Sequence, residues 1–202
     1  MPEMPSRFDK TNIALRGIVQ ALTSAVNGAA SVAQGLSWKD AGAPEEEPWP
    51  VTGEPADSPD KLLELIRGDF VDRSYLWSGL ITPEIYADGC VYEDPTLRFE
   101  GLAQFQRNLR NLDPLIKRFV RDSSVTLYAI EAKEGGGLIE ARWRMRGRIT
   151  APWRPILDVS GTTRFFFARQ DADATFRVVM YKETWEEPVW RALGQLVTRG
   201  RD

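Results

Sequence analysis

The chain has 202 residues, of which 43% are hydrophobic and 27% are charged, a composition typical of a globular protein with a packed core. Its formal net charge of −3 does not indicate nucleic-acid binding. It contains no histidine and one cysteine, Cys90, which excludes histidine-based catalysis, an intrachain disulfide and a cysteine-rich zinc site. Any chemistry must come from carboxylate, tyrosine, lysine or arginine side chains or a borrowed cofactor, and we expect no metal site and no cofactor of the chain's own.

Three segments of different composition follow one another along the chain. Residues 1–37 form an extension in which 11–36 carry apolar side chains at the spacing of an amphipathic helix. Such a helix would dock on the domain, lie on a membrane surface or belong to an organelle-targeting segment. Residues 38–57 form a linker rich in proline and glutamate, and 58–202 form the folded domain. No run of 18 apolar residues occurs, so we expect no transmembrane segment.

The folded domain begins with helices. Ser58 is a good N-cap and Pro59 suits the first helical position, so the first helix is expected to begin here. We expect a second, short helix over 82–89, a short strand over 91–94 and a third helix after Gly101.

After Arg118 the spacing of apolar residues changes from 3.6 to 2, which predicts strands. The clearest alternation puts Ile139, Ala141, Trp143, Met145 and Ile149 on one face and Glu140, Arg142, Arg144, Arg146 and Arg148 on the other. The glycine-rich stretch 134–137 predicts a hairpin turn before this strand. Further strands are expected over 162–168 and 176–186, followed by a C-terminal helix over 188–197.

Helices followed by a four-stranded antiparallel meander indicate an α+β fold. Because long antiparallel strands twist, we expect a cone-shaped roll: a curved antiparallel sheet covered by the N-terminal helices, enclosing a cavity with an open mouth. The predicted ligand-binding residues point into this cavity and suit a hydrophobic small molecule: Tyr86, Trp143, Met145, Phe165, Tyr181 and Trp185. The alternative is that these side chains are simply core.

The arginine ladder, defined as Arg142, Arg144, Arg146 and Arg148, must point away from Trp143. Aligned like charges favour an opposing partner, so the ladder is a predicted docking face for an acidic protein surface or anionic lipid headgroups. The alternative is cross-strand pairing with acids such as Glu131 and Glu183. The sheet also offers a surface for a homodimer.

The order of elements, the stretch Val91-Tyr92-Glu93-Asp94-Pro95 and the glycine that opens the third helix resemble the nuclear transport factor 2-like superfamily. That superfamily includes ketosteroid isomerase and the SnoaL-type polyketide cyclases. Residues 69–101, 157–167 and 183–196 are similar to a narrower plant, algal and cyanobacterial group classed as a domain of unknown function. This resemblance implies a location in the chloroplast or the cyanobacterial cytoplasm.

The resemblance to ketosteroid isomerase implies that Asp94 is a proton-transferring base, with Tyr75 or Tyr92 assisting. The alternative is that Asp94 accepts backbone N–H groups in a turn. The isomerase also needs a tyrosine where this chain has Phe70 and a second acid where it has Thr163, so steroid-type isomerisation is not expected.

A further set of acids lies at the end of the last predicted strand. SnoaL-type cyclases carry an acid near this place, and the resemblance assigns it to Glu186 or Glu187, close to Glu183. The alternative is that these acids are solvated and favour the start of the C-terminal helix.

Two functions therefore stay open. The favoured one is a non-catalytic plastid module that binds a hydrophobic small molecule or a partner protein, because the oxyanion donors are missing and the charge is uneven. The other is a small acid–base enzyme, a dehydratase, cyclase or isomerase, that uses Asp94.

Overall fold

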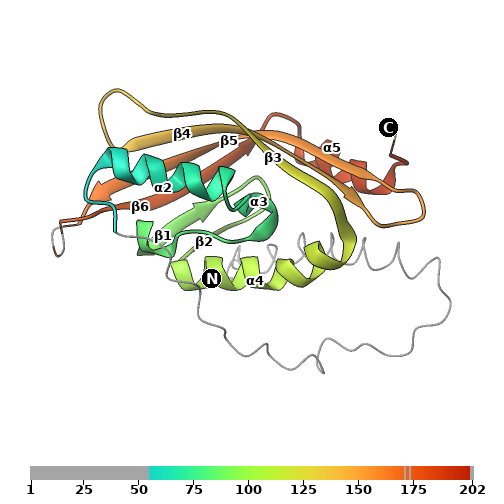
Figure 1. The fold of residues 1–202 in the computed structure, drawn as a ribbon, viewed down its shortest axis with the longest axis horizontal. Coiled ribbons are helices and arrows are strands. Elements are labelled where there is room, and N and C mark those ends of the chain that lie inside the picture. Colours follow the sequence, from blue (N-terminus) through green and yellow to red (C-terminus); the bar gives the residue numbers. More distant parts are fainter. Residues whose placement is uncertain (1–54, 171, 173, 201–202) are drawn as a thin grey trace, which may run out of the picture.

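The computed structural model of the protein describes residues 55–170, 172 and 174–200. The predicted extension over 1–37 and nearly all of the linker over 38–57 lie outside the described residues. The described part contains a curved six-stranded sheet with helices packed against it (Figure 1). The predicted α+β cone-shaped roll is therefore confirmed.

The helical elements are short except for two. They are α2 (Pro59–Val71), α3 (Tyr75–Ser78), the 3-10 turn η1 (Pro83–Ile85), α4 (Leu102–Phe119), α5 (Val189–Gly194) and the 3-10 turn η2 (Gln195–Val197). The predicted start of the first helix is confirmed, because the Ser58 side chain accepts a hydrogen bond from the Lys61 N–H at 3.3 Å. None of the helices in the described residues is both long and apolar enough to cross a bilayer.

The sheet contains β1 (Tyr86–Glu93), β2 (Arg98–Glu100), β3 (Val120–Ala132), β4 (Leu138–Ile149), β5 (Ile156–Arg169) and β6 (Phe176–Trp185). Their order in the sheet is β2-β1-β6-β5-β4-β3. The predicted antiparallel meander of the last four strands is confirmed, and β1 extends it by pairing in parallel with β6.

The predicted second helix over 82–89 is wrong. Only one 3-10 turn forms, and the chain enters β1 at Tyr86. Residues of β1 pair with β6, about 90 positions later in the sequence, and such long-range backbone pairing outweighs the local helix signal.

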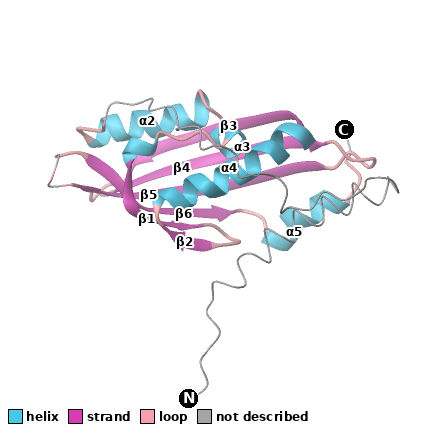
Figure 2. Ribbon diagram, turned by 90° about the horizontal axis from the view of Figure 1, so that it is seen from below, coloured by secondary structure: helices cyan, strands magenta, loops and turns pink. Residues whose placement is uncertain are grey.

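The helices α2, α3 and α4 lie on the concave face of the sheet, whereas α5 and η2 lie against β5 near the C-terminus (Figure 1, Figure 2). The α3 helix is attached to the sheet by Trp77, whose indole N–H donates to the Ser124 carbonyl at 3.1 Å. A β-carbon on Gly147 would lie 2.7 Å from Cζ2 of this ring, so the absence of a side chain there lets α3 approach β4.

The predicted alternation of the two sheet faces is confirmed. Trp143 is fully buried on the inner face, whereas the Arg144 side chain is 46% exposed on the outer face. Gly161 makes room for the Trp143 ring on the neighbouring strand, because a β-carbon there would lie 2.6 Å from Cζ2 of the indole.

The interior of the cone is filled with aromatic rings in contact. The ring of Tyr92 stacks on Phe105 with centroids 4.0 Å apart and on Phe99 at 5.3 Å. Tyr181 lies 5.4 Å from Phe165, edge to face. The space for which the sequence predicted a cavity is thus occupied by the protein's own side chains, as expected for core packing.

Candidate functional site

Three polar side chains lie next to one another on the inner side of the sheet: the buried Thr163, Glu183, and Asp94 directly after β1. Thr163 of β5 is directly opposite Glu183 of β6. In the parallel pairing of β1 with β6, Glu93 is opposite Lys182, so the next residue, Asp94, lies beside Glu183. The negative charge of Asp94 is one of the causes that raise the pKa of Glu183.

The carboxyl group of Glu183 is held by two donors. The Tyr181 hydroxyl donates to Oε2 at 2.5 Å, and the Trp185 indole N–H donates to Oε1 at 2.7 Å. Burial raises the pKa of Glu183 to about 7, although both hydrogen bonds act in the opposite direction. The residue keeps an intermediate exposure, so this carboxyl group titrates near neutrality while still within reach of solvent.

The network extends from Glu183 into the core. The Tyr75 and Tyr181 hydroxyls lie 3.1 Å apart, and the Trp143 indole N–H donates to Thr163 Oγ1 at 2.8 Å. Burial raises the pKa of both tyrosines well above its usual range, so both stay protonated. Tyr75, Tyr181 and Glu183 therefore form a continuous chain of exchangeable protons.

Asp94 fulfils the predicted turn role through only one of its two oxygens. Its Oδ1 accepts from the Thr96 N–H at 2.6 Å, the Thr96 hydroxyl at 2.6 Å and the Leu97 N–H at 2.9 Å. Its Oδ2 accepts no hydrogen bond from any residue that the structure describes. Burial raises the pKa of Asp94 despite these three donors.

Tyr92, the other tyrosine predicted to assist Asp94, is buried between Phe99 and Phe105. Apart from the nearby Cys90 thiol, its hydroxyl has no hydrogen-bond partner within the described part of the chain. Burial raises the pKa of the Cys90 thiol to about 11, which makes it a poor nucleophile. The Tyr92 hydroxyl makes no hydrogen bond to Asp94 among the described residues, and its catalytic role stays a prediction.

The predicted ligand-binding residues differ in their exposure. Tyr86, Trp143, Phe165 and Tyr181 are all buried in the core, whereas Met145 and Trp185 keep an intermediate exposure. Their role in binding stays a prediction, and Trp185 is the member that contacts the carboxyl row directly.

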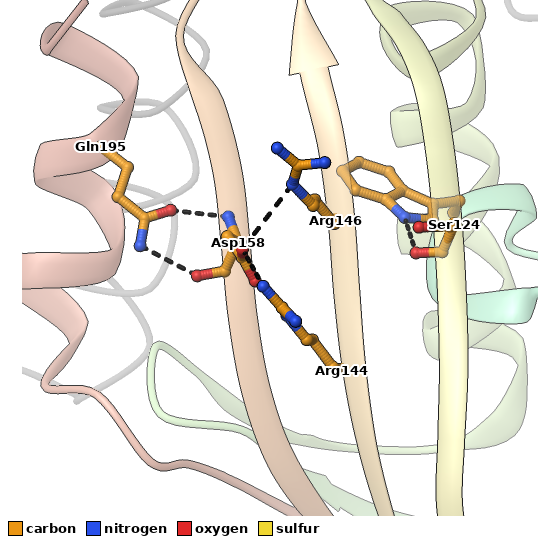
Figure 3. Close-up of polar contacts among 6 residues, drawn as sticks. Ser124, Arg144, Arg146, Asp158 and Gln195 are labelled. Carbon is orange, nitrogen blue, oxygen red and sulfur yellow. Dashed lines mark hydrogen bonds and ion pairs between the residues drawn. The ribbon is translucent and has the colours of Figure 1, made fainter. Parts of the chain in front are cut away.

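The arginine ladder lies on the outer face, as predicted. Arg144 forms a bidentate pair with Asp158 at 2.6 and 2.5 Å, and Arg146 reaches the same carboxylate at 3.7 Å (Figure 3). Arg148 pairs with Asp122 at 3.4 Å, whereas Arg142 is exposed and has no partner among the described residues. The role of the ladder in docking stays a prediction.

The acids expected to pair with the ladder are different from those observed. Glu183 faces the interior, and Glu131 pairs with Lys133. The strand is period-2 throughout, so Glu183 must share a face with Tyr181 and Trp185, and this signal could have identified it as a site residue. Glu186 is exposed, and Glu187 pairs with Arg191 in the first turn of α5 at 3.0 Å.

The described residues contain no cluster of side chains that could bind a metal ion. No group of three or more cysteine, aspartate or glutamate side chains there could hold an ion. Within the carboxyl row itself, Asp94 and Glu183 both have raised pKa values and lie among hydroxyl and indole donors.

The element order and the curved six-stranded sheet give an α+β fold of the nuclear transport factor 2-like kind, the fold that the sequence resemblance implied. The chain belongs to the family described as "Uncharacterized conserved protein (DUF2358)", which matches residues 60–173. Its predicted placement in a plant, algal and cyanobacterial group stays a prediction. Among curated proteins no similar sequence was found.

Several solved structures are similar to the chain in fold. A hypothetical protein from Catenulispora acidiphila with a ketosteroid isomerase-like fold, in complex with trimethylamine, is 15% identical, with a TM-score of 0.47 over 67% of this chain and 93% of that one. A predicted SnoaL-like polyketide cyclase from Jannaschia sp. CCS1 is 15% identical, with a TM-score of 0.48 over 74% of this chain and 100% of that one. A predicted isomerase from Bacillus subtilis is 17% identical, with a TM-score of 0.48 over 67% of this chain and 94% of that one. At this identity the likeness concerns fold and not activity.

Proposed function

We propose that the domain is a small acid–base enzyme in which Asp94 and Glu183 move a proton on a small, largely apolar substrate at the mouth of the cone. The observation that carries the proposal is the pair of neighbouring carboxyl groups of Asp94, in the turn directly after β1, and Glu183 on β6, with the pKa of Glu183 raised to about 7. Paired acids with raised pKa values are typical of catalytic sites, because one can donate while the other accepts.

The two carboxyl groups differ in what they can do. Asp94 is fixed through Oδ1 and keeps Oδ2 without a hydrogen bond from the described residues, which suits a base that accepts a proton from carbon. Glu183 is protonated below about pH 7 and then can donate a hydrogen bond to a developing oxyanion. In this proposal Glu183, which lies opposite Thr163 on the next strand, takes the role of the second acid that the isomerase resemblance required at position 163.

A proton shift within a carbonyl compound illustrates the reaction class. Asp94 Oδ2 removes a proton from the carbon next to the carbonyl, and the electron pair moves to the carbonyl oxygen. Glu183 donates a hydrogen bond to that oxygen, and Asp94 returns the proton two carbons further along the double bond. The sequence balances without any co-reactant, and Tyr181 holds Glu183 in place throughout.

The test uses 3-cyclohexen-1-one as a probe, whose conversion to the conjugated ketone is followed by ultraviolet absorbance. Rates with the full chain should rise as Asp94 loses its proton and fall as Glu183 loses its own near pH 7. Asp94→Asn should reduce the rate by roughly 10²–10⁴-fold, the usual contribution of a general base. Glu183→Gln keeps a donor but does not titrate, so it should remove the alkaline decline.

The matched control is Glu64→Gln, which removes an exposed carboxyl group from α2. It should leave the rate and its pH profile unchanged. Conversion no faster than in buffer, or equally fast with Asp94→Asn, contradicts the proposal.

A second candidate function, the non-catalytic plastid docking module, is favoured by the arginine ladder. Arg142 is exposed without a partner within the described residues, and Arg144 and Arg146 share one carboxylate. An acidic protein segment would complement this excess of positive charge. Binding of a poly-glutamate peptide should then weaken in Arg142→Gln but not in Arg67→Gln on α2. Equal binding by wild type and both variants argues against docking.

A further inference from the structure

An open hollow lies at the end of the sheet where β3 begins and β4 ends. Its volume is about 430 Å³, and its walls carry Arg121, Arg148, Arg154 and Asp122 together with the backbone turn 149–151. Three guanidinium groups face one carboxylate, so the lining has a net charge of +2 from these side chains. A concave surface with this balance favours a compact anion.

The three arginines are held in different ways. The Arg121 guanidinium donates to the carbonyls of Lys117 and Val120 at 2.9 and 2.8 Å, which fixes the side chain at the end of α4. Arg148 pairs with Asp122 at 3.4 Å. The Arg154 side chain has no partner among the residues that the structure describes.

A purely structural role explains only part of this cluster. Positive side chains such as Arg121 stabilise the C-terminal end of a helix, where backbone carbonyls lack partners. That account does not extend to Arg154, which lies in the turn between β4 and β5. Arg154 and Asp122 also have φ values of 44° and 50°, a conformation uncommon for residues other than glycine. Two of the four described non-glycine residues with positive φ thus line the hollow, the other two being Ser74 and Ala174.

We propose that this hollow binds a phosphomonoester group, with Arg121, Arg148 and Arg154 donating to its oxygens. Guanidinium groups present paired N–H donors that match phosphate oxygens, and three of them would neutralise a dianion. The only apolar side chains on the wall are those of Ile149 and Ala151, so a bulky apolar ligand finds little contact there. The site does not depend on the chemistry proposed for Asp94 and Glu183.

The same phosphomonoester chemistry occurs in soluble phosphate esters and in phosphatidic acid. The first measurement is calorimetric titration of the full chain with phenyl phosphate at about 0.15 M ionic strength and pH 7.5, where charges far from the hollow are screened. Saturable binding should weaken about tenfold in Arg154→Gln, the usual effect of losing one charge-assisted hydrogen bond. Arg148→Gln should weaken it by a similar factor.

Arg67→Gln on α2 removes one exposed positive charge elsewhere and is the matched control. It should leave the affinity within a factor of about two, because screened charges at that distance contribute little. Affinity that is the same in wild type and Arg154→Gln, or that falls equally in Arg67→Gln, would overturn the proposal. Thermal unfolding of each variant establishes that the loss is one of binding and not of folding.

Co-sedimentation with phosphatidylcholine vesicles, with and without phosphatidic acid, identifies the source of the phosphate. Retention that needs phosphatidic acid and is lost in Arg154→Gln assigns the site to a lipid headgroup. Phenyl phosphate binding without retention on vesicles assigns it to a soluble ester. Retention that persists in Arg154→Gln, with no binding of phenyl phosphate, overturns the site.

Discussion

The two faces of the sheet are built from the same strands but differ in what surrounds their side chains. On β4, Trp143 is fully buried and donates to Thr163, whereas the next residue, Arg144, is 46% exposed and pairs with Asp158. At these two positions the inner face combines apolar burial with a satisfied polar group, and the outer face carries an ion pair in contact with water. We infer that stability depends mainly on the inner face, because exposed ion pairs such as that of Arg144 contribute little to it.

The sharpest test of this contrast is to remove the two neighbouring side chains in turn. Trp143→Ala should lower the free energy of unfolding by about 3–5 kcal/mol, because it leaves a cavity and removes the indole N–H that donates to Thr163 Oγ1. Arg144→Ala is the matched control and should cost about 1 kcal/mol or less. Urea unfolding followed by circular dichroism measures both, and similar losses would show that the faces do not differ.

The next largest effect concerns the pH dependence of stability. The pKa of Glu183 is raised from its ordinary 4.5 to about 7, so between these values the folded protein binds a proton that the unfolded chain has released. Stability must then fall as the pH rises through this window, by up to roughly 3 kcal/mol, and be lowest above it. Asp94, whose pKa is also raised, contributes in the same direction.

Glu183→Gln should remove most of this decline, because a carboxamide does not titrate. Urea unfolding of wild type and variant at pH 5 and pH 8 gives the difference directly. Glu64→Gln on the surface of α2 serves as the control. If wild type and Glu183→Gln lose the same free energy of unfolding between pH 5 and pH 8, Glu183 is not the group with the raised pKa.

The same contrast explains which features the sequence could predict. The alternation of Trp143 and Arg144 is a local pattern repeated along one strand, so the two faces and the meander were predictable. The start of β1 at Tyr86 was not, because it depends on parallel pairing with β6. Only the register of the finished sheet brings Asp94 beside Glu183, whereas the isomerase resemblance pointed to position 163 and the cyclase resemblance to Glu186 or Glu187. The filled interior also escaped prediction, since periodicity tells which side chains point inward but not how completely they pack.

A smaller effect should arise at the exposed end of β5, where β6 no longer covers it. The Gln195 side chain takes the place of a neighbouring strand there: its Oε1 accepts from the Asp158 N–H at 2.7 Å, and its Nε2 donates to the Asp158 carbonyl at 2.9 Å (Figure 3). Gln195→Ala should cost about 1–2 kcal/mol, because it leaves both backbone groups without this partner. Gln195→Glu keeps the acceptor only and should cost an intermediate amount. Unchanged urea midpoints for both variants would show that water replaces the side chain without loss.

The smallest effect, and the one that defines the outer face, is the coupling between Arg144 and Asp158. Their contact is bidentate, which favours a measurable energy, but both side chains are partly exposed and Arg146 shares the carboxylate. A double-mutant cycle with Arg144→Ala, Asp158→Ala and the double variant should give about 0.2–1 kcal/mol at low salt. The coupling should shrink further in 1 M salt, where charges are screened beyond about 3 Å. A coupling of several kcal/mol that resists salt would mean that this ion pair stabilises the fold as strongly as contacts on the inner face do.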